Sequence, residues 1–544
     1  MKSLRKIFFF SILLYTQKLF SLPFEMIPAD DPVLEDLRYI SMESGIPFLS
    51  FTPPLSPDEI EQFLNSLDIE KMSLSAKNAY SRIKNRLILK APLSFTSNTF
   101  SIFFNISSTL ETRARFSKDI SWEQENTQVP PLLSIPIRSC FFNFFQLYVE
   151  PILAVNPVRY INTERFGVNV PYSYDHFELN MPLRAFVAAG ASWWNFQLGR
   201  DRLFWGTGHT GSLSFSGNSA FSDFMRLSIF SKFFKYSLLI SQMPLQITGS
   251  LYPNFNQNQN SMLQTTMRYF YLHRIDASFF GKISLSVMEG IMAGNSGLEL
   301  RFLNPLAIFH SFFSWLDYDL WTGGSGEGSM IGSFFSAELN WNIYKNLAFY
   351  AQFVMNEIAI SSESNSGNVE PPNSLGYLTG LNFTHSFDTW ASIFFLEFIY
   401  TDPYCYMLSS PFASFIQMRR ISPDHVQYYY MGYPRDTIAI TIGAKFFTSE
   451  KLSLTGSISL ISRGEHNKGG LIWDWEKTRE AFEAKTPTGT TENRLIATMG
   501  ARWKPLPYLV ICGNLSGIFS KNNKHQSGED KFGGQAMVSV GFQL

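Results

Sequence analysis

The sequence predicts an all-β transmembrane barrel of about 18 antiparallel strands, preceded by a small α-helical periplasmic module. Three observations lead to this expectation: the pattern of the last residues, the pattern of the first residues, and the composition. The C-terminal segment places apolar residues on one parity, with small or polar residues between them: Ala536, Val538, Val540, Phe542 and Leu544. A period of two is typical of a strand that has lipid on one face and a polar lumen on the other. We therefore expect the terminal strand to close the sheet.

The N-terminus has the plan of a secretory signal peptide. Basic residues among the first six positions precede an apolar run over residues 7–15, and Ser21-Leu22-Pro23 follows. This order of a basic, an apolar and a small-residue region predicts export and cleavage, with the signal over residues 1–22. The apolar run is too short to span a bilayer. No cysteine stands near the cleavage region, so we expect no lipid anchor.

The composition favours a membrane protein that crosses with strands. Of the 544 residues, 16% are aromatic and 16% are charged. Outside the signal, no apolar run approaches the roughly 18 residues that a spanning helix needs. The formal net charge of -1 gives no reason to expect nucleic acid as a partner. The three cysteines, Cys140, Cys405 and Cys512, are widely separated and odd in number, which excludes a disulfide framework.

Residues 23–86 show a helical pattern that predicts a separate module. The segment Ser56-Pro57-Asp58-Glu59 has an N-capping serine, a proline at the first helical position and acidic residues in the first turn. An earlier helix is expected after Pro32, and a third over residues 76–87. Charged residues interrupt the apolar stripes, which are too narrow to cross a bilayer. We expect the module in the periplasm, packed against the barrel mouth through Leu34, Leu37, Ile60 and Phe63.

From about residue 87 to 544 the hydrophobic period changes to two, which predicts the barrel. Residues 438–446 and 452–460 are clear cases, because each has one apolar face and one small or polar face. A soluble sandwich also alternates, but the many aromatic residues at strand ends favour the interfacial girdles of a barrel. Four polar stretches are expected as long outer loops: residues 253–261, 322–329, 361–374 and 464–492.

Motifs that resemble enzyme signatures carry little weight here. Gly206, Gly208 and Gly211 match the spacing of a dinucleotide-binding loop, but the flanking residues are charged before it and strand-like after it, so we interpret the stretch as a turn. His385 and Ser386 are adjacent on an expected strand, where neighbours point to opposite faces and cannot act on each other. The eight histidines show no metal-ligand spacing. We predict no enzyme and no cofactor.

Residues 196–220, FQLGRDRLFWGTGHTGSLSFSGNSA, resemble the signature of the Wzi-type capsule assembly proteins of the outer membrane. Further elements follow in that family's order: His273-Arg274, Glu289-Gly290, Leu303-Asn304-Pro305, Asn356-Glu357, Glu397, Thr401-Asp402-Pro403 and Gly432-Tyr433-Pro434. The N-terminal helical segment is similar to that family's periplasmic module. The resemblance implies a plugged barrel of about 18 strands that holds surface polysaccharide.

The charged and aromatic residues of these elements form the candidate site: Arg200, Asp201, Arg202, Trp205, His209, Glu289, Glu357 and Glu397. One interpretation is that the arginines, the tryptophan and the histidine meet an acidic sugar by ion pairing and stacking. The other is that these residues form an internal ladder of charges that fills the lumen. We favour the ladder, because polar residues in a barrel lumen normally pair with one another.

Two functional classes follow. The first is a non-catalytic outer-membrane barrel that binds or anchors surface polysaccharide. The alternative is a passive or substrate-selective outer-membrane channel whose charged residues line an open lumen. In both cases the expected partners are the lipid bilayer and the barrel assembly machinery, and the expected location is the outer membrane.

Overall fold

The computed structural model describes most of the chain after the expected signal peptide. The described residues are 24–88, 93–97, 99–117, 120, 129–156, 166–178, 184–217, 221–247, 264–294, 297–306, 331–357, 372–388, 390–408, 410–422, 425–448, 451–468 and 485–544. The expected signal, residues 1–22, lies outside these ranges. No helix within the described ranges is both long and apolar enough to cross a membrane.

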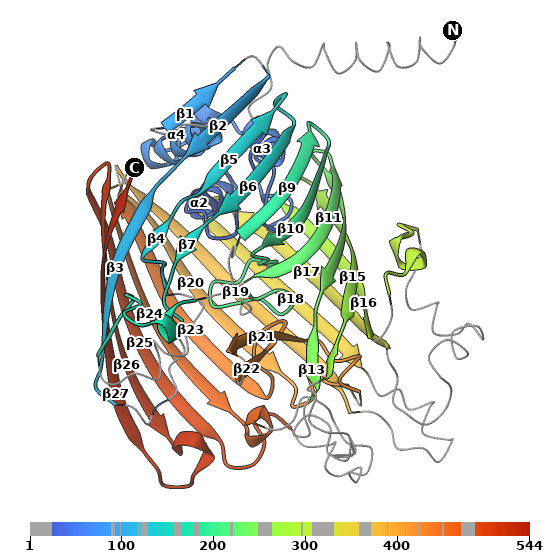
Figure 1. Cartoon of the computed structure of the whole chain (residues 1–544), viewed down its shortest axis with the longest axis vertical. Helices are drawn as coiled ribbons and strands as arrows, with labels where there is room; N and C mark the ends of the chain where they lie inside the picture. Colours follow the sequence, from blue (N-terminus) through green and yellow to red (C-terminus); the bar gives the residue numbers. More distant parts are fainter. Residues whose placement is uncertain are drawn as a thin grey trace.

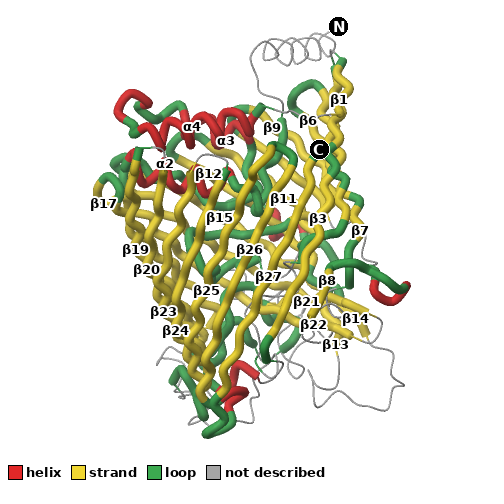
Figure 2. The backbone as a smooth tube through the Cα atoms, turned by 90° about the vertical axis from the view of Figure 1, so that its left-hand side faces the viewer, coloured by secondary structure: helices red, strands yellow, loops and turns green. Residues whose placement is uncertain are grey.

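Within the described residues, 23 strands join in one antiparallel sheet that curves round into a barrel (Figures 1 and 2). The first ten are β1 (Leu93–Thr96), β2 (Phe100–Phe104), β3 (Ser107–Arg115), β4 (Leu133–Ser134), β5 (Ile137–Phe141), β6 (Phe145–Glu150), β7 (Ile152–Leu153), β8 (Phe166–Val168), β9 (Arg184–Ala191) and β10 (Trp194–Asp201). The others are β11 (Ser222–Phe230), β12 (Phe234–Gln242), β15 (Arg268–Phe279), β16 (Ile283–Gly294), β17 (Ile331–Tyr344), β18 (Leu347–Glu357), β19 (Ser374–Phe387), β20 (Trp390–Thr401), β23 (Thr437–Thr448), β24 (Leu452–Arg463), β25 (Glu492–Leu506), β26 (Leu509–Lys521) and β27 (Lys531–Gln543).

The expected number of strands agrees with the structure. Three pairs of strands, β2 with β3, β4 with β5 and β6 with β7, are single runs of chain divided by one or two residues. When each pair is counted once and the short strands β1 and β8 are set apart, the described sheet has 18 strands around the barrel. Two small hairpins lie apart from it: β13 (Leu245–Ile247) with β14 (Gln264–Thr266), and β21 (Ile416–Ser422) with β22 (His425–Tyr430).

The terminal strand β27 joins the last part of the sheet to the first. It pairs with β26 on one side and with β3 on the other, where Gln543 lies opposite Ser107. Beyond the strand, the Leu544 amide donates to the Ile106 carbonyl at 2.8 Å. The C-terminal residues therefore have backbone partners on two sides, as the alternating pattern predicted.

Alternation along the strands separates an apolar outer face from a polar or small inner face. On β23, Ile440 and Ile442 are 45% and 59% exposed, whereas Ala439 and Thr441, on the other parity, are buried. On β24, Leu460 is 56% exposed. Large apolar side chains exposed in a regular row are costly in water and suited to lipid.

The expected helical module forms three α-helices, α2 (Val33–Ser44), α3 (Pro57–Leu64) and α4 (Leu74–Leu87), with a short 3-10 helix, η2 (Ile69–Lys71). Ser56 caps α3 as expected. Its side chain accepts a hydrogen bond from the Glu59 amide, and the Glu59 carboxylate accepts one from the Ser56 amide. Gly45, at φ 74°, ends α2 in a left-handed conformation. The helices lie at one end of the barrel, near the C-terminus (Figures 1 and 2).

The module packs into that mouth of the barrel with its own core. Leu37 and Ile60 are fully buried and Phe63 is 8% exposed, while Leu34 packs against them partly buried. The same cluster contains Ala348, Ala391 and Ile393 from the barrel wall. The four residues expected to dock the module therefore belong to one shared apolar cluster.

Most of the expected outer loops lie outside the described residues. This holds for residues 253–261 and 322–329, for 361–371, and for 469–484. The described remainder includes the 3-10 helix η8 (Glu465–Lys468), which follows β24. Two further 3-10 helices follow wall strands: η4 (Tyr174–His176) after β8 and η5 (Leu300–Leu303) after β16. A third, η9 (Asn523–His525), lies between β26 and β27.

Candidate functional site

The connection between β10 and β11 enters the lumen, and we call its residues 203–216 the plug segment. Trp205 and Phe215 pair by an isolated bridge within it, and Trp205 and Leu213 are fully buried. They belong to an apolar cluster with inward-facing residues from several wall strands, such as Phe270 and Val354. The described part of the lumen at this level is thus packed with side chains.

Glu397 of β20 holds the plug segment by hydrogen bonds to its backbone. Its Oε2 accepts from the His209 amide at 2.8 Å and from the Tyr350 hydroxyl at 2.7 Å. Its Oε1 accepts from the Thr210 amide at 3.0 Å and from the Thr210 hydroxyl. Glu397 is 1% exposed. A buried carboxylate needs such donors, and here three come from the plug segment and one from β18, which lies two strands away from β20 in the sheet.

The His209 side chain is enclosed by residues of the wall and the module and does not face a solvent-filled channel. Its ring stacks on Phe395 with centroids 4.2 Å apart, and its Nε2 lies 2.8 Å from Asn382 Oδ1 and 3.2 Å from Arg38 Nη1. Burial, followed by the nearby Arg38 and Lys445, keeps the pKa of His209 well below its ordinary value. A neutral ring is therefore expected at pH 7, so this residue supplies no positive charge for an acidic ligand.

The glycine motif is a turn in the plug segment, as interpreted from the sequence. Gly206 has a φ of 138°, which an L side chain rarely adopts. A side chain at Gly208 would collide with the carbonyl of Gly211. The strand before the motif belongs to an antiparallel wall, and β11 follows it, so the surroundings are not those of a dinucleotide site.

Asp201 is the last residue of β10, and Arg202 follows it directly. Asp201 is fully buried and pairs with Arg184 Nε at 2.8 Å, while Gln197 donates to it at 3.1 Å. The Arg202 guanidinium lies 5.1 Å from the centre of the Phe221 ring. Trp205 has the Arg274 guanidinium 5.9 Å from its ring. Asp201 therefore has an inward ion pair, but its partner is Arg184, which was not among the expected residues.

Arg200 and Glu289 do not join the ladder, because their strands point them outward. Arg200 has the parity of the exposed Leu198 and forms two hydrogen bonds with Asp223, at 2.7 and 2.9 Å. Glu289 has the parity of the exposed Leu285 and Val287 on β16. Glu357 ends β18, and its side chain lies outside the described residues. Of the expected acidic partners, Glu397 contacts the plug segment.

A charged network on the inner wall was not predicted from the sequence. Arg274 donates to Asp276 at 2.9 Å and to Glu338 at 2.8 Å, and all three are nearly fully buried. Gln352 extends the network, since it donates to Glu338 at 2.8 Å and accepts from the Leu213 amide at 2.6 Å. That these side chains point inward could be predicted from the alternation of each strand. Which of them pair could not be predicted, because pairing depends on the register and curvature of the sheet.

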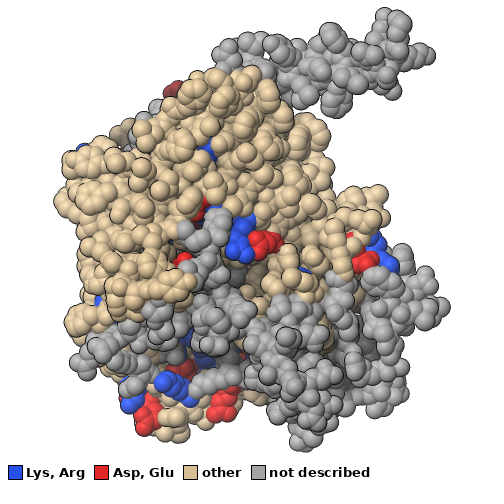
Figure 3. Space-filling model, in the orientation of Figure 1, with Lys and Arg blue, Asp and Glu red and all other residues tan. Residues whose placement is uncertain are grey.

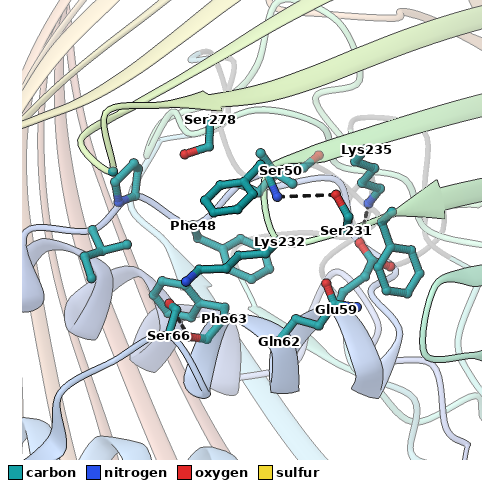
Figure 4. A pocket seen from close by; sticks show the side chains of 16 residues that line it. Phe48, Ser50, Glu59, Gln62, Phe63, Ser66, Ser231, Lys232, Lys235 and Ser278 are labelled. Atoms are coloured by element: carbon teal, nitrogen blue, oxygen red, sulfur yellow. Dashed lines mark hydrogen bonds and ion pairs between the residues drawn. The ribbon is translucent and has the colours of Figure 1, made fainter.

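Ion pairs also join the module to the wall. Glu59 pairs with Lys235, and both side chains are nearly fully buried. Although burial opposes ionisation, Lys235 and then Arg226 lower the pKa of Glu59. Arg226 itself donates to the backbone carbonyl of Thr52 at 3.0 Å. A cavity of about 170 Å³ lies beside the Glu59–Lys235 pair (Figure 4), between α3 and the turn after β11, and is lined mainly by apolar side chains such as Phe48.

Within the described residues, no group of three or more His, Cys, Asp or Glu side chains could hold a metal ion. The described cysteines are all free thiols.

The fold resembles that of a solved outer-membrane barrel. Wzi, an outer-membrane protein involved in group 1 capsule assembly in Escherichia coli and described as a carbohydrate-binding β-barrel, matches with a TM-score of 0.57 and 15% identity, over 94% of this chain and 98% of Wzi. OprD of Pseudomonas aeruginosa matches with a TM-score of 0.39 and 8% identity, over 81% of this chain and 95% of that chain. OmpT of Vibrio cholerae gives 0.32 and 8%, over 83% and 100%. No protein-family model and no curated protein matches the sequence. The chain therefore has the fold of an outer-membrane β-barrel, and at this identity the likeness to Wzi extends to the fold alone.

Proposed function

We propose that the protein is a non-catalytic outer-membrane β-barrel of the capsule-assembly type that binds or anchors surface polysaccharide. The observation that carries this proposal is the plug segment, which lies in the lumen with Trp205 and Leu213 fully buried and with Glu397 bonded to its backbone. A packed lumen suits a protein that holds a ligand better than one that conducts solutes. The fold likeness to a carbohydrate-binding barrel and the sequence resemblance support the same choice.

Two outward ion pairs support a membrane position for the wall. Arg200 with Asp223, and Arg301 with Glu299, form ion pairs close to those ends of β10, β11 and β16 that lie farther along the chain from the hairpin turns of the module end. On the face drawn in Figure 3, the upper part has few charged atoms. At the module end, exposed aromatic side chains stand at the hairpin turns, such as the 91% exposed Phe280. Charged pairs at one limit and aromatic residues at the other are expected where an apolar band meets water.

The proposed orientation places the module in the periplasm. The module and Leu544 lie at the same end of the barrel (Figure 1), and barrels with an even number of strands have both ends on the periplasmic side. We also propose that residues 1–22 are a cleaved export signal and that the barrel assembly machinery inserts the protein into the outer membrane.

The test combines conductance with ligand retention. The purified protein in a planar lipid bilayer is expected to give no stable conductance steps. Detergent-solubilised protein, immobilised and exposed to polysaccharide extracted from the surface of the source cells, is expected to retain it, while a folded porin of similar size does not. Stable steps without retention would contradict the proposal and favour the alternative, a passive or substrate-selective channel.

A further inference from the structure

The inner face of β24, β25 and β26 changes character along the strands. Toward the end away from the module it packs into the apolar cluster of the plug segment, where Ile461, Ile496 and Ile518 are at most 7% exposed. Toward the module end, the inward-facing positions carry small residues that are partly or fully exposed: Ser453, Thr455, Ser457, Thr498, Gly500 and Asn514. We call this exposed part of the inner face the recess. It ends at the three isoleucines.

The module packs on other parts of the wall. Its apolar cluster includes residues of β18 and β20, and its ion pairs reach β5, β9, β12 and β23. Within the described ranges, no ion pair joins the module to β24, β25 or β26. Water can therefore enter the recess beside the module.

Arg502 brings to the recess a positive charge that is not neutralised by a neighbour. It has the inward parity of its strand, is partly exposed, and lies opposite Ser453 on β24 and Cys512 on β26. Among the residues that the structure describes, its guanidinium has no ion pair and no hydrogen bond. The inward acidic residues of β25 and β3, Glu492 and Glu111, are each paired with an arginine of their own strand.

The surrounding charges do not cancel that of Arg502. Lys504, two residues nearer the turn, also has no ion pair within the described residues. Lys445 of β23 borders the recess but is paired with Glu35 of the module. The carboxylate that ends the chain, at Leu544, lies beside the Ile106 backbone, on the far side of β27. The recess thus has a local excess of positive charge, which favours an anion.

Hydrogen-bond donors surround an open space next to Arg502. A side chain at Gly500 would lie 2.6 Å from the Thr455 hydroxyl and 3.6 Å from the Asn514 amide nitrogen, so these two groups flank the space that the glycine leaves. The Asn514 carbonyl oxygen already accepts from Ser516 at 3.2 Å. Within the described part of the chain, the Asn514 amide nitrogen and the Thr455 hydroxyl have no hydrogen-bond partner. A guanidinium, an amide and a hydroxyl that converge without an acceptor suit an oxyanion.

We propose that the recess binds the phosphate group of a small anion. The Arg502 guanidinium takes two of its oxygens, and the Thr455 hydroxyl and the Asn514 amide donate to the others. Phosphate fits better than carboxylate, because the donors come from three strands and a tetrahedral group presents oxygens in several directions. The phosphate has two sources: a soluble phosphate compound, or the headgroup of a lipid at the barrel rim. This site is independent of the proposed polysaccharide binding.

Cys512 provides a reporter for the test. Its thiol lies directly across from Arg502 on the same face and is partly exposed, whereas Cys140 and Cys405 are buried. The full mature protein, folded in detergent, is treated with an anionic and a cationic methanethiosulfonate reagent of similar size, and each rate is divided by that of the same reagent with 2-mercaptoethanol. The anionic reagent should be favoured roughly tenfold at low ionic strength, because a positive charge about 5 Å away attracts it and repels the other.

Phosphate binding is measured as protection of this thiol. Millimolar inorganic phosphate should slow the anionic reagent severalfold more than sodium chloride of the same ionic strength, since chloride only screens the charge. A second arm uses mixed micelles that contain phosphatidic acid. Protection by inorganic phosphate identifies a soluble source, and protection by phosphatidic acid alone identifies a lipid headgroup.

Three variants locate the effect. Arg502→Gln should lower the preference for the anionic reagent to about threefold or less and remove the protection. Asn514→Ala should weaken the protection but keep the preference, because it removes a donor and no charge. Lys521→Gln is the matched control, since Lys521 is exposed at the other end of β26 and its loss changes the net charge equally. Cys512→Ser should abolish labelling, and heat-modifiable migration checks that each variant is folded.

Several results would overturn the proposal. One is a Cys512 thiol that reacts with neither reagent in the folded protein, because the recess would then be closed. Others are equal relative rates in the wild type, or a preference that Arg502→Gln leaves unchanged. Phosphate that acts no more strongly than chloride, with no protection by phosphatidic acid, would leave a charged surface without a phosphate site.

Discussion

The change Glu397→Gln tests whether the plug segment is held by one buried carboxylate. Each carboxylate oxygen accepts two hydrogen bonds: Oε2 from the His209 amide and the Tyr350 hydroxyl, and Oε1 from the amide and hydroxyl of Thr210. The amide group of glutamine replaces one of these oxygens by a donor. Two donors then lose their acceptor whichever way the side chain is turned.

The expected cost follows from those two lost bonds. Hydrogen bonds to a charged group contribute about 1.5–3 kcal/mol each, so the closed position of the plug segment should lose about 3 kcal/mol. Because each 1.4 kcal/mol is a factor of ten, the population with the plug segment released should rise roughly a hundredfold. Single-channel recording in planar bilayers measures this as a rise in the frequency of openings over the wild type, which is expected to be silent.

Glu492→Gln provides the matched control. Glu492 is likewise buried, at 3% exposure, but its partners are Arg494, Ser520 and the Lys524 amide, outside the plug segment. It should lower the unfolding temperature without raising the opening frequency. If Glu397→Gln leaves the recordings silent while the folded barrel is confirmed on gels, Glu397 does not hold the plug segment closed.

Four further outcomes are expected. Removal of residues 538–544 should abolish heat-modifiable migration and outer-membrane insertion, because β27 loses a large part of its pairing with each neighbour; a truncated protein that still fractionates with outer membranes in folded form would contradict this. A cysteine at position 61 in place of Glu61 should resist an impermeant thiol reagent in intact cells and react once the outer membrane is breached, and labelling of intact cells would place the module outside. Burial, with neighbouring glutamates, raises the pKa of Asp58 from 3.8 to about 6. The charged form is therefore disfavoured in the folded protein, and stability should fall as the pH rises from about 4 to about 6 and stay level above that. Asp58→Asn should raise the unfolding temperature clearly at pH 7.5 and little near pH 4, whereas equal gains at both pH values would exclude the charge as the cause. Arg184→Ala, which removes the partner of a buried aspartate, should lower the unfolding temperature clearly, and Arg200→Ala, from a half-exposed pair, should hardly change it; equal shifts would refute the assignment of inner and outer faces.

The strand pattern and the capping signals of the module could be predicted because they are local. A period of two needs no knowledge of neighbours, and neither does the serine, proline and acidic sequence at the start of α3. Parity also separates Arg200 from Asp201: Arg200 shares the parity of Trp194, Phe196 and Leu198, which is the outer face. Strict use of that rule would have kept Arg200 out of the ladder.

The partners of the inner residues could not be predicted in the same way. Arg274 on β15 reaches Glu338 on β17, two strands away, and Gln352 on β18 reaches back to the Leu213 amide of the plug segment. These distances depend on the register of successive hairpins and on the curvature of the wall, which no local pattern contains. The position of the plug segment could not be predicted for the same reason. A turn-rich stretch has the same local sequence pattern whether it lies outside the barrel or inside it.

The charges between module and wall explain why the module sits in one position. Glu25 pairs with Arg138, Asp30 with Arg184 and Glu59 with Lys235, and in each pair at least one side chain is almost fully buried. Buried ion pairs contribute little net stability, since desolvation offsets the attraction, but separating one leaves an unpaired charge, which is strongly unfavourable. A barrel without its module would therefore hold Lys235 and Arg138 in the lumen without these carboxylates. The apolar cluster around Leu37 and Ile60 supplies the favourable burial, and the ion pairs select the position in which the module docks.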